Sequence, residues 1–200
     1  MLFILGACNL SGEPANEQNP DIPVTDRWTK DRVFLSPARA ANGADAGLLP
    51  DKTKSILRIE KTLKYGEYVW NDKNIGPGKL LVRVDLRTQL ISVFRGKHEI
   101  GTAVILFGAK GNDTPIGTFP VKAKSRDHHS RTYDAPMPFS LWLTDDGVAV
   151  HGSEVRWGAG THGCVGVPLG FAGKLFQQAE VGDTIEILRS PRQEPSSTSL

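Results

Sequence analysis

Apolar and polar residues alternate along short stretches in the middle of the chain, with the two-residue period of half-buried β-strands. The clearest stretch covers residues 82–87, and two further strand-like stretches follow it at residues 90–94 and 99–107. Short turns separate them, Thr88-Gln89 after the first and Gly96-Lys97 after the second. The pattern therefore predicts three successive strands that form a β-meander.

The second half of the chain continues this pattern and then changes to a helical one. Short apolar stretches predict four further strands, at residues 118–122, 139–143, 148–151 and 184–188. Apolar residues recur at helical spacing over residues 171–179, which predicts one amphipathic helix. The polar residues 125–138 predict a long loop, either an ordinary surface loop or a lid. We therefore expect a mostly β fold with one amphipathic helix near its C-terminal end.

The segments outside this pattern give the expected domain organisation. The patterned region predicts a domain over residues 79–188. Residues 9–50 are polar and contain several prolines, which predicts a flexible tether. Residues 51–78 are mixed and favour neither a helix nor a strand. Residues 189–200 are rich in serine and proline, and we expect a disordered tail there.

The first eight residues form an apolar segment that ends at Cys8. The stretch Leu5-Gly6-Ala7-Cys8 resembles a bacterial lipobox, the signal for attaching lipid to a cysteine. A lipid anchor on Cys8 would place the protein in the bacterial cell envelope, on the periplasmic side. The alternative is an apolar terminus with an incidental cysteine, because the segment is short and lacks a preceding basic residue.

Composition narrows the class of protein. The chain has 200 residues, of which 39% are hydrophobic and 8% aromatic, which suits one packed domain with extensions. The formal net charge of +2 is too small to predict a nucleic-acid partner. No apolar run is as long as a membrane-spanning helix. We expect a monomer.

The residues most suited to chemistry are Thr161-His162-Gly163-Cys164, with a second histidine upstream at His151. The only other cysteine is Cys8, so we expect Cys164 to have no disulfide partner. A thiolate is a strong nucleophile, and a nearby imidazole can take the thiol proton and return it to a leaving amine. Gly163 permits a sharp turn that would direct the amides of Gly163 and Cys164 toward one point, as an oxyanion hole requires.

Two other uses of these residues are compatible with the sequence. A single cysteine is often a buried and inert apolar group, and a histidine at a strand end is often only hydrogen-bonded. Zinc would find four tetrahedral ligands in His151, His162, Cys164 and either His128 or His129. No C-x-x-C or H-E-x-x-H spacing accompanies them, which counts against zinc.

Together these residues resemble the L,D-transpeptidase catalytic domain of the YkuD type. That family carries a histidine, a spacer and then Ser/Thr-His-Gly-Cys, which correspond here to His151 and residues 161–164. The resemblance covers roughly residues 79–188, in the order of the family. Three further stretches match it: Thr114-Pro115-Ile116-Gly117-Thr118-Phe119, Ala135-Pro136-Met137-Pro138-Phe139 and Gly147-Val148-Ala149-Val150-His151-Gly152.

The resemblance implies a β-sandwich or barrel-like fold and acyl transfer on the stem peptides of peptidoglycan, with formation of 3-3 cross-links. It implies that Cys164 is the nucleophile, His151 the proton donor and acceptor, and His162 an assisting residue. Gly163 would supply an oxyanion amide. The implied substrate-binding residues are Thr161, Gly152, Met137 and Arg156. No metal or organic cofactor is implied.

Two features depart from the pattern of the family. Gly166 stands two residues after the cysteine, where the family usually has arginine or asparagine, and the spacer between His151 and Thr161 is short. Arg131 or Arg156 would have to replace the missing side chain in space. The alternatives are a carboxypeptidase or hydrolase that uses water as acceptor, and a degenerate domain that only binds peptidoglycan.

Overall fold

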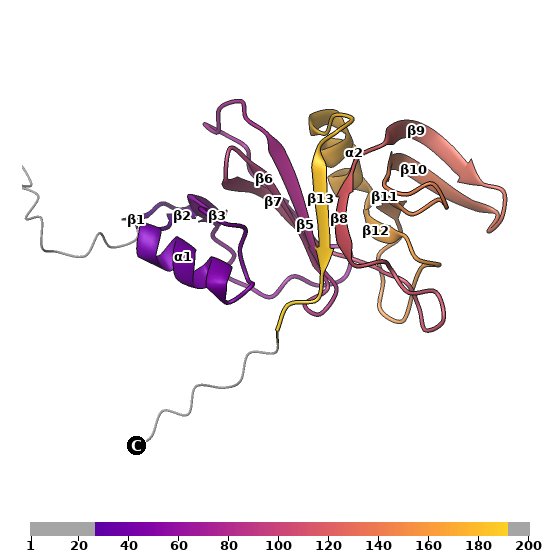
Figure 1. Ribbon diagram of the computed structural model, residues 1–200, viewed down its shortest axis with the longest axis horizontal. Coiled ribbons are helices and arrows are strands. Elements are labelled where there is room, and N and C mark those ends of the chain that lie inside the picture. The colour runs from indigo at the N-terminus through magenta and orange to yellow at the C-terminus, as the bar shows by residue number, and fades with distance from the viewer. Residues whose placement is uncertain (1–26, 192–200) are drawn as a thin grey trace, which may run out of the picture.

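Two β-sheets pack against each other with one helix between them (Figure 1). The computed structural model describes residues 27–191. This part of the chain forms thirteen strands and two helices. The predicted mostly β fold with an amphipathic helix near its C-terminal end is confirmed, and its two-sheet arrangement is that of a sandwich.

The larger sheet is built on the predicted meander. Its strands are β1 (Arg27–Trp28), β2 (Arg32–Phe34), β3 (Ser55–Leu57), β4 (Tyr68–Trp70), β5 (Leu80–Asp85), β6 (Leu90–Arg95), β7 (His98–Val104), β8 (Gly117–Pro120) and β13 (Thr184–Leu188). They lie in the order β1-β2-β3-β7-β6-β5-β13-β8, and β4 also pairs with β7. The last strand, β13, runs parallel to β5 and so joins the end of the domain to its beginning.

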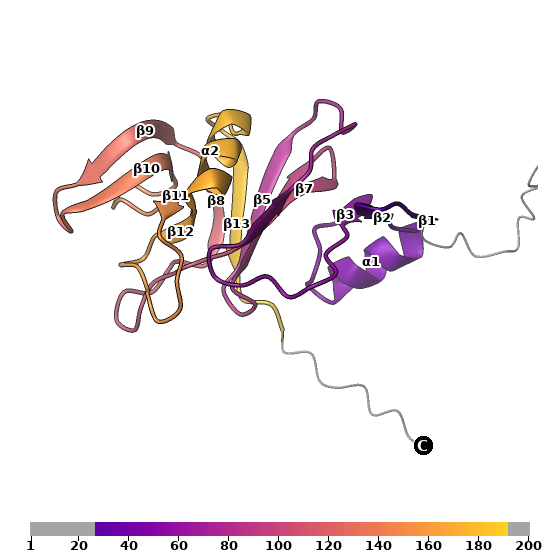
Figure 2. The ribbon, with the colours of Figure 1, turned by 180° about the vertical axis from the view of Figure 1, so that it is seen from behind.

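The smaller sheet contains β9 (Ala123–Ser130), β10 (Ala135–Trp142), β11 (Ala149–Ser153) and β12 (Val165–Pro168). Its order is β12-β11-β10-β9, and β11 and β12 are parallel. Helix α2 (Leu169–Gln178) follows β12 directly and packs against β10, β11 and β12. Figure 2 shows the same layers from behind.

The core lies between the two sheets and is filled by α2. Phe171, on the apolar face of α2, is fully buried. Its ring meets the rings of Trp70 at 5.4 Å and Tyr68 at 5.9 Å, both on β4 of the larger sheet. Edge-to-face aromatic pairs at these distances add to the gain from burial. The helix therefore fixes the smaller sheet, which carries the candidate catalytic residues, against the larger one.

The expected tether over residues 9–50 is wrong for residues 27–50, which form β1, β2 and helix α1 (Pro37–Asp45). The Oγ of Ser36 accepts a hydrogen bond from the amide of Arg39, and Pro37 occupies the first turn, both of which favour a helix start. The only buried residue of α1 is Ala40, so the helix has no apolar stripe that a periodicity would reveal. Residues 51–78 supply β3 and β4 to the sheet.

The expected loop over residues 125–138 is also wrong, because most of it belongs to the β9–β10 hairpin. This hairpin projects from the body of the molecule (Figure 1), and its first strand, β9, is polar on both faces after Ala123, so it shows no alternation. Strand β12 was not predicted, for the opposite reason. All four of its residues are buried, and a short stretch buried on both faces does not alternate either.

The expected disordered tail begins later than residue 189. Ser190 is buried, its amide donates to Asp85, and its carbonyl accepts from Arg87. Cys8 and the rest of the lipobox-like segment, residues 9–26 of the tether and residues 192–200 of the tail lie outside the described residues. Within residues 27–191, no helix has the length and apolarity needed to cross a membrane.

Candidate active site

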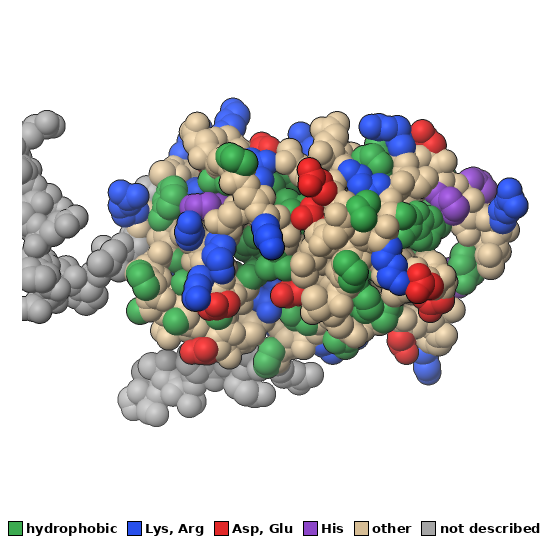
Figure 3. Space-filling view, turned by 45° about the horizontal axis from the view of Figure 1, so that its top comes forward, with side chains coloured by type: hydrophobic (Ala, Val, Ile, Leu, Met, Phe, Trp, Pro, Cys, Tyr) green, Lys and Arg blue, Asp and Glu red, His purple; other side chains and the backbone are tan. Residues whose placement is uncertain are grey.

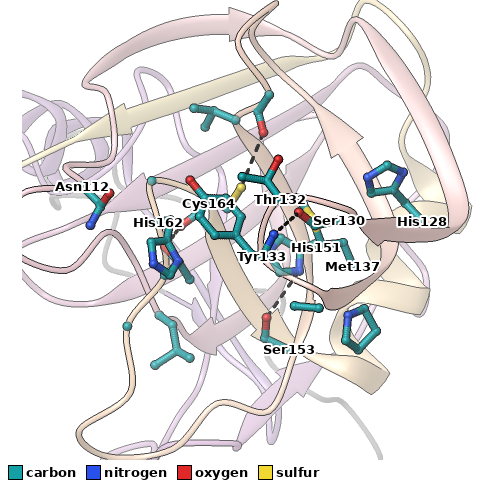
Figure 4. A pocket seen from close by; sticks show the side chains of 18 of the residues that line it. Asn112, His128, Ser130, Thr132, Tyr133, Met137, His151, Ser153, His162 and Cys164 are labelled. Atoms are coloured by element: carbon teal, nitrogen blue, oxygen red, sulfur yellow. Dashed lines mark hydrogen bonds between the residues drawn. The ribbon is translucent and has the colours of Figure 1, made fainter.

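The pairing of β11 with β12 places Cys164 and His151 on the same face of the smaller sheet. Val150 of β11 pairs with Val165 of β12, and both valines are buried in the core. Neighbouring side chains along a strand point to opposite faces, so His151 and Cys164 point away from the core. Both line a cleft of about 1090 Å³ (Figure 4).

His151 is held at one ring nitrogen. Its Nδ1 lies 2.9 Å from the carbonyl oxygen of Gly152 and 3.4 Å from the Oγ of Ser153. A carbonyl only accepts hydrogen bonds, so Nδ1 carries the proton and Nε2 keeps a lone pair. Burial lowers the pKa of His151, the bond to Gly152 opposes this change, and the charge of His128 adds to it. The imidazole is therefore neutral near pH 7 and able to accept a proton.

Cys164 is half-buried at the entrance to β12. Its Sγ donates a weak hydrogen bond of 3.7 Å to the carbonyl of Gly147. Burial raises the pKa of the Cys164 thiol, and a hydrogen bond from the Ala149 amide only partly opposes this. The site at rest therefore holds a neutral thiol beside a neutral imidazole, not a thiolate–imidazolium pair.

The turn before Cys164 is fixed by hydrogen bonds and by one glycine. The Oγ1 of Thr161 donates to the carbonyl of Cys164 at 2.6 Å, and the amide of Thr161 donates to Phe107 at 3.0 Å. Gly163 has a φ of +105°, which strongly favours glycine. Within residues 27–191, the amides of Gly163 and Cys164 donate no hydrogen bond to another residue. They are thus available to an oxygen atom of a ligand.

The tip of the β9–β10 hairpin forms one wall of the cleft. Tyr133 at this tip stacks on His162, with ring centroids 4.2 Å apart and an interplanar angle of 17°. Figure 4 shows Tyr133 and Thr132 beside Cys164. His162 is exposed and its ring is engaged with the hairpin. The structure therefore places His162 where it joins the catalytic turn to the hairpin.

The remaining predicted residues divide into two groups. Met137, Thr161 and Arg156, which the resemblance implies to be substrate-binding residues, line the cleft. Gly152 does not line it, because its backbone lies under Leu169 and Pro138, which would meet an added Cβ at 3.0 and 3.1 Å. Gly152 contributes a carbonyl group to His151 and no direct contact with the cleft.

A sequence profile of the L,D-transpeptidase catalytic domain, YkuD, matches residues 79–187. The chain belongs to this family. A search of curated protein sequences finds no match.

Solved structures of L,D-transpeptidases share the fold. The L,D-transpeptidase LdtMt1 in complex with imipenem has a TM-score of 0.50 and 25% identity, over 54% of this chain and 58% of that one. An L,D-transpeptidase from Stackebrandtia nassauensis has a TM-score of 0.51 and 24% identity, over 58% of each chain. One from Mycobacterium smegmatis has a TM-score of 0.50 and 22% identity, over 55% and 58%. The matched region thus spans 58% of the length of these structures.

The unusual glycine of this L,D-transpeptidase domain, Gly166, is closely packed. It pairs with His151 and exchanges two backbone hydrogen bonds with Leu106, at 2.8 and 2.9 Å. A Cβ at this position would meet the Oγ of Ser153 at 2.8 Å and its Cβ at 3.0 Å. Ser153 therefore occupies the space of the missing side chain. Arg131 and Arg156 both line the cleft, together with the acidic residues Asp113, Asp146 and Glu154.

Sequence reasoning missed two residues of this site. Ser153 contacts the ring of His151, and its position two residues further along the same strand was the signal that could have revealed it. Tyr133 had no such signal, because its contact with His162 depends on the course of a hairpin that was expected to be a loop.

The zinc ligand set considered from the sequence is not assembled. Among residues 27–191, no three His, Cys, Asp or Glu side chains are grouped closely enough to hold a metal ion. His129 pairs with Asp134 at 2.9 Å, and His128 packs edge-on against Trp142, with centroids 4.8 Å apart.

Proposed function

We propose that the protein is a cysteine L,D-transpeptidase that forms 3-3 cross-links between peptidoglycan stem peptides. The observation that carries this proposal is the pairing of β11 with β12, which brings the thiol of Cys164 and the neutral imidazole of His151 into one cleft. Membership in the family supplies the substrate class.

Acylation begins when the Sγ of Cys164 attacks the carbonyl carbon between the third residue of a tetrapeptide stem and its terminal D-Ala. The Nε2 of His151 takes the thiol proton as the S–C bond forms. The oxyanion receives hydrogen bonds from the amides of Gly163 and Cys164. The C–N bond then breaks, His151 returns the proton to the leaving nitrogen, and D-Ala departs from the thioester.

Deacylation repeats the sequence with a second substrate. The side-chain amine of the third residue in a neighbouring stem attacks the thioester carbon and transfers a proton to His151. The C–S bond breaks, the sulfur leaves, and it recovers a proton from His151. One peptide bond replaces another, so the reaction needs neither an external energy source nor an oxidant.

The neutral resting pair determines when the nucleophile forms. Burial disfavours both the thiolate of Cys164 and the imidazolium of His151, so charge separation before substrate binds is unfavourable. The oxyanion amides of Gly163 and Cys164 add stabilisation as negative charge develops on the substrate. Proton transfer is thus coupled to attack, which protects the thiol between turnovers.

Incubation of the full chain with purified disaccharide-tetrapeptide, followed by mass spectrometry, tests the proposal. We expect cross-linked dimers and free D-Ala from the wild type and none from Cys164→Ala. His128→Gln, a change at another cleft histidine, is the matched control and is expected to keep most activity. Tripeptide without dimer would show water as the acceptor, hence a carboxypeptidase. If none of the three proteins releases a product, the proposal that this protein is an enzyme is contradicted.

Imipenem provides a second readout that needs no stem peptide. LdtMt1 was solved in complex with this compound. We expect imipenem to add covalently to Cys164, with an increase in intact mass that Cys164→Ala lacks. This test isolates the reactivity of the thiol from the choice of acceptor.

We also propose that the protein resides at the periplasmic side of the envelope, with lipid on Cys8. The lipobox-like sequence from Leu5 to Cys8 supports this location. A Cys8→Ala variant of the full chain should move from the membrane pellet to the soluble fraction. An unchanged distribution would contradict the anchor.

A further inference from the structure

A second pocket lies where the N-terminal segment meets the larger sheet, and it shares no residue with the Cys164 cleft. Its volume is about 510 Å³. Residues 50–54, between α1 and β3, form one wall, and the start of β5 and the β6–β7 turn form the other. Leu81 and Phe94 supply an apolar surface inside it. The pocket is therefore large enough for a ligand with an apolar part.

Four lysines surround this apolar surface: Lys52, Lys54, Lys79 and Lys97. Asp51 is the only acidic residue that lines the pocket, and it lies 3.9 Å from Lys52. Within residues 27–191, Lys54 and Lys79 form no ion pair. Figure 3 shows Lys and Arg side chains gathered over this N-terminal side of the molecule. The pocket thus carries a net positive charge that the protein itself does not neutralise.

The backbone at two of these lysines is strained. Lys52 has a φ of 57° and Lys97 a φ of 73°, in the left-handed region that favours glycine or asparagine. Gly96, beside Lys97, also has a positive φ. Glycine would fit both lysine positions with less strain, so the turns themselves do not require lysine. Strain of this kind concentrates at ligand sites, where the side chain has a use that offsets it.

We propose that this lysine pocket binds an anionic phospholipid, with the phosphate among the four ammonium groups and an acyl chain against Leu81 and Phe94. Ammonium groups bind phosphate as point charges from several directions. A free phosphate would leave the apolar surface exposed to water, and a neutral apolar ligand would leave Lys54 and Lys79 without a counter-charge. An anionic amphiphile satisfies both parts of the pocket.

Titration calorimetry on the full chain tests this, with dihexanoyl phosphatidylglycerol below its micelle concentration as the probe. All proteins carry Cys164→Ala, so the result does not depend on the proposed transpeptidase activity. The double variant Lys54→Gln/Lys79→Gln should bind this lipid about tenfold more weakly, or worse. Lys73→Gln/Lys174→Gln, which removes the same charge at exposed positions outside the pocket, should bind like the parent.

Two further titrations separate the components of the ligand. Dihexanoyl phosphatidylcholine, with the same chains and no net charge, should bind at least tenfold more weakly than phosphatidylglycerol. Leu81→Ala should weaken binding of phosphatidylglycerol and leave any binding of inorganic phosphate unchanged. Equal affinity for the two lipids would overturn the proposal. So would a Lys54→Gln/Lys79→Gln variant that binds phosphatidylglycerol as tightly as Lys73→Gln/Lys174→Gln does, or inorganic phosphate that binds as tightly as the lipid.

Discussion

Two places in this molecule bury groups that can carry charge, and they differ in how many partners those groups have. The first is the junction of β2, β3 and β7, around Arg32 and Glu99. Arg32 donates hydrogen bonds to the Oγ of Ser55 at 2.9 Å and to the carbonyls of Glu99 at 2.7 Å and Asn71 at 2.9 Å. These bonds tie the N-terminal segment to the sheet of the catalytic domain.

The carboxyl group of Glu99 is equally well surrounded. Its two oxygens accept hydrogen bonds from the amide of Leu57 at 2.8 Å and the Oγ of Ser92 at 2.7 Å. At the second place, His151 is bonded at Nδ1 only, and the thiol of Cys164 has a weak bond to the carbonyl of Gly147 and one from the amide of Ala149. A buried polar group with all its partners holds a structure together, whereas one with an unused atom is available to a substrate.

The largest effect should follow from removing Nε2 of His151, the ring nitrogen that is free to accept a proton. We expect His151→Gln to lower kcat for transpeptidation by about 10²- to 10⁴-fold, because the proton acceptor for Cys164 is lost. Urea denaturation should show nearly unchanged stability. A variant that loses stability and activity in parallel would show that His151, like Arg32, mainly stabilises the fold.

At the first site, around Arg32, we expect a substitution to lower stability and to leave activity unchanged. Arg32→Met leaves three accepting oxygens without their donor and should lower the free energy of unfolding by about 3 kcal/mol. Its activity per folded molecule should match the wild type when measured well below the denaturation midpoint. Lys30→Met, at an exposed position nearby in sequence, is the control for the substitution itself.

The ionisation of Cys164 gives the next effect. Because burial raises the pKa of the thiol, alkylation by iodoacetamide should accelerate about tenfold for each pH unit, with its inflection above the usual cysteine value of about 8.5. A Cys8→Ala background leaves Cys164 as the only thiol. An inflection well below pH 8 would instead show a thiolate–imidazolium pair.

A smaller effect is expected from Glu99. Burial raises the pKa of this carboxyl, although the bonds from Leu57 and Ser92 and the charge of Arg32 oppose the change. The folded state then holds the proton more tightly than the unfolded state. The resulting stability is present below the usual glutamate pKa of about 4.3 and is lost as pH rises through the folded value.

Urea midpoints measured from pH 4 to pH 8 should therefore fall with pH in the wild type more steeply than in Glu99→Gln. Glu60→Gln, at an exposed position, should keep the wild-type slope. Equal slopes in all three proteins would show that Glu99 ionises in the folded state as it does in the unfolded chain.

The smallest effect concerns Ser153, which fills the space beside Gly166. Its contact with Nδ1 of His151 is 3.4 Å, at the limit of a hydrogen bond, while the carbonyl of Gly152 lies at 2.9 Å. Ser153→Ala should change kcat by no more than about threefold, since the shorter bond keeps the ring oriented. A loss comparable to that of His151→Gln would show that Ser153, not Gly152, orients the imidazole.

The sequence predicted those parts of the fold whose faces differ in polarity. β5, β13 and most of β6 alternate between a buried and a half-buried face, so their period was visible. α1 was missed because it begins at a capping serine and a proline and buries only Ala40, so it has no apolar stripe. The polar strand β9 and the fully buried β12 lack a contrast between faces.

The same reasoning explains which site residues were predicted. His151 and Cys164 were identified by their chemistry and by a recognisable sequence around them. The position of Gly152 behind the cleft follows from strand parity, and could have been derived from the strand predicted at residues 148–151. The stacking of Tyr133 on His162 depends on the three-dimensional course of a long hairpin, which local patterns do not encode.

The parallel pairing of β11 and β12 separates two properties that evolution can change independently. The spacing of thiol and imidazole depends on the backbone register of two buried strands. The shape of the cleft depends on the exposed segment from Glu154 to Gly160 and on the tip of the β9–β10 hairpin. Insertions or deletions in those surface segments leave the register intact, so one reactive pair can serve descendants with different substrates.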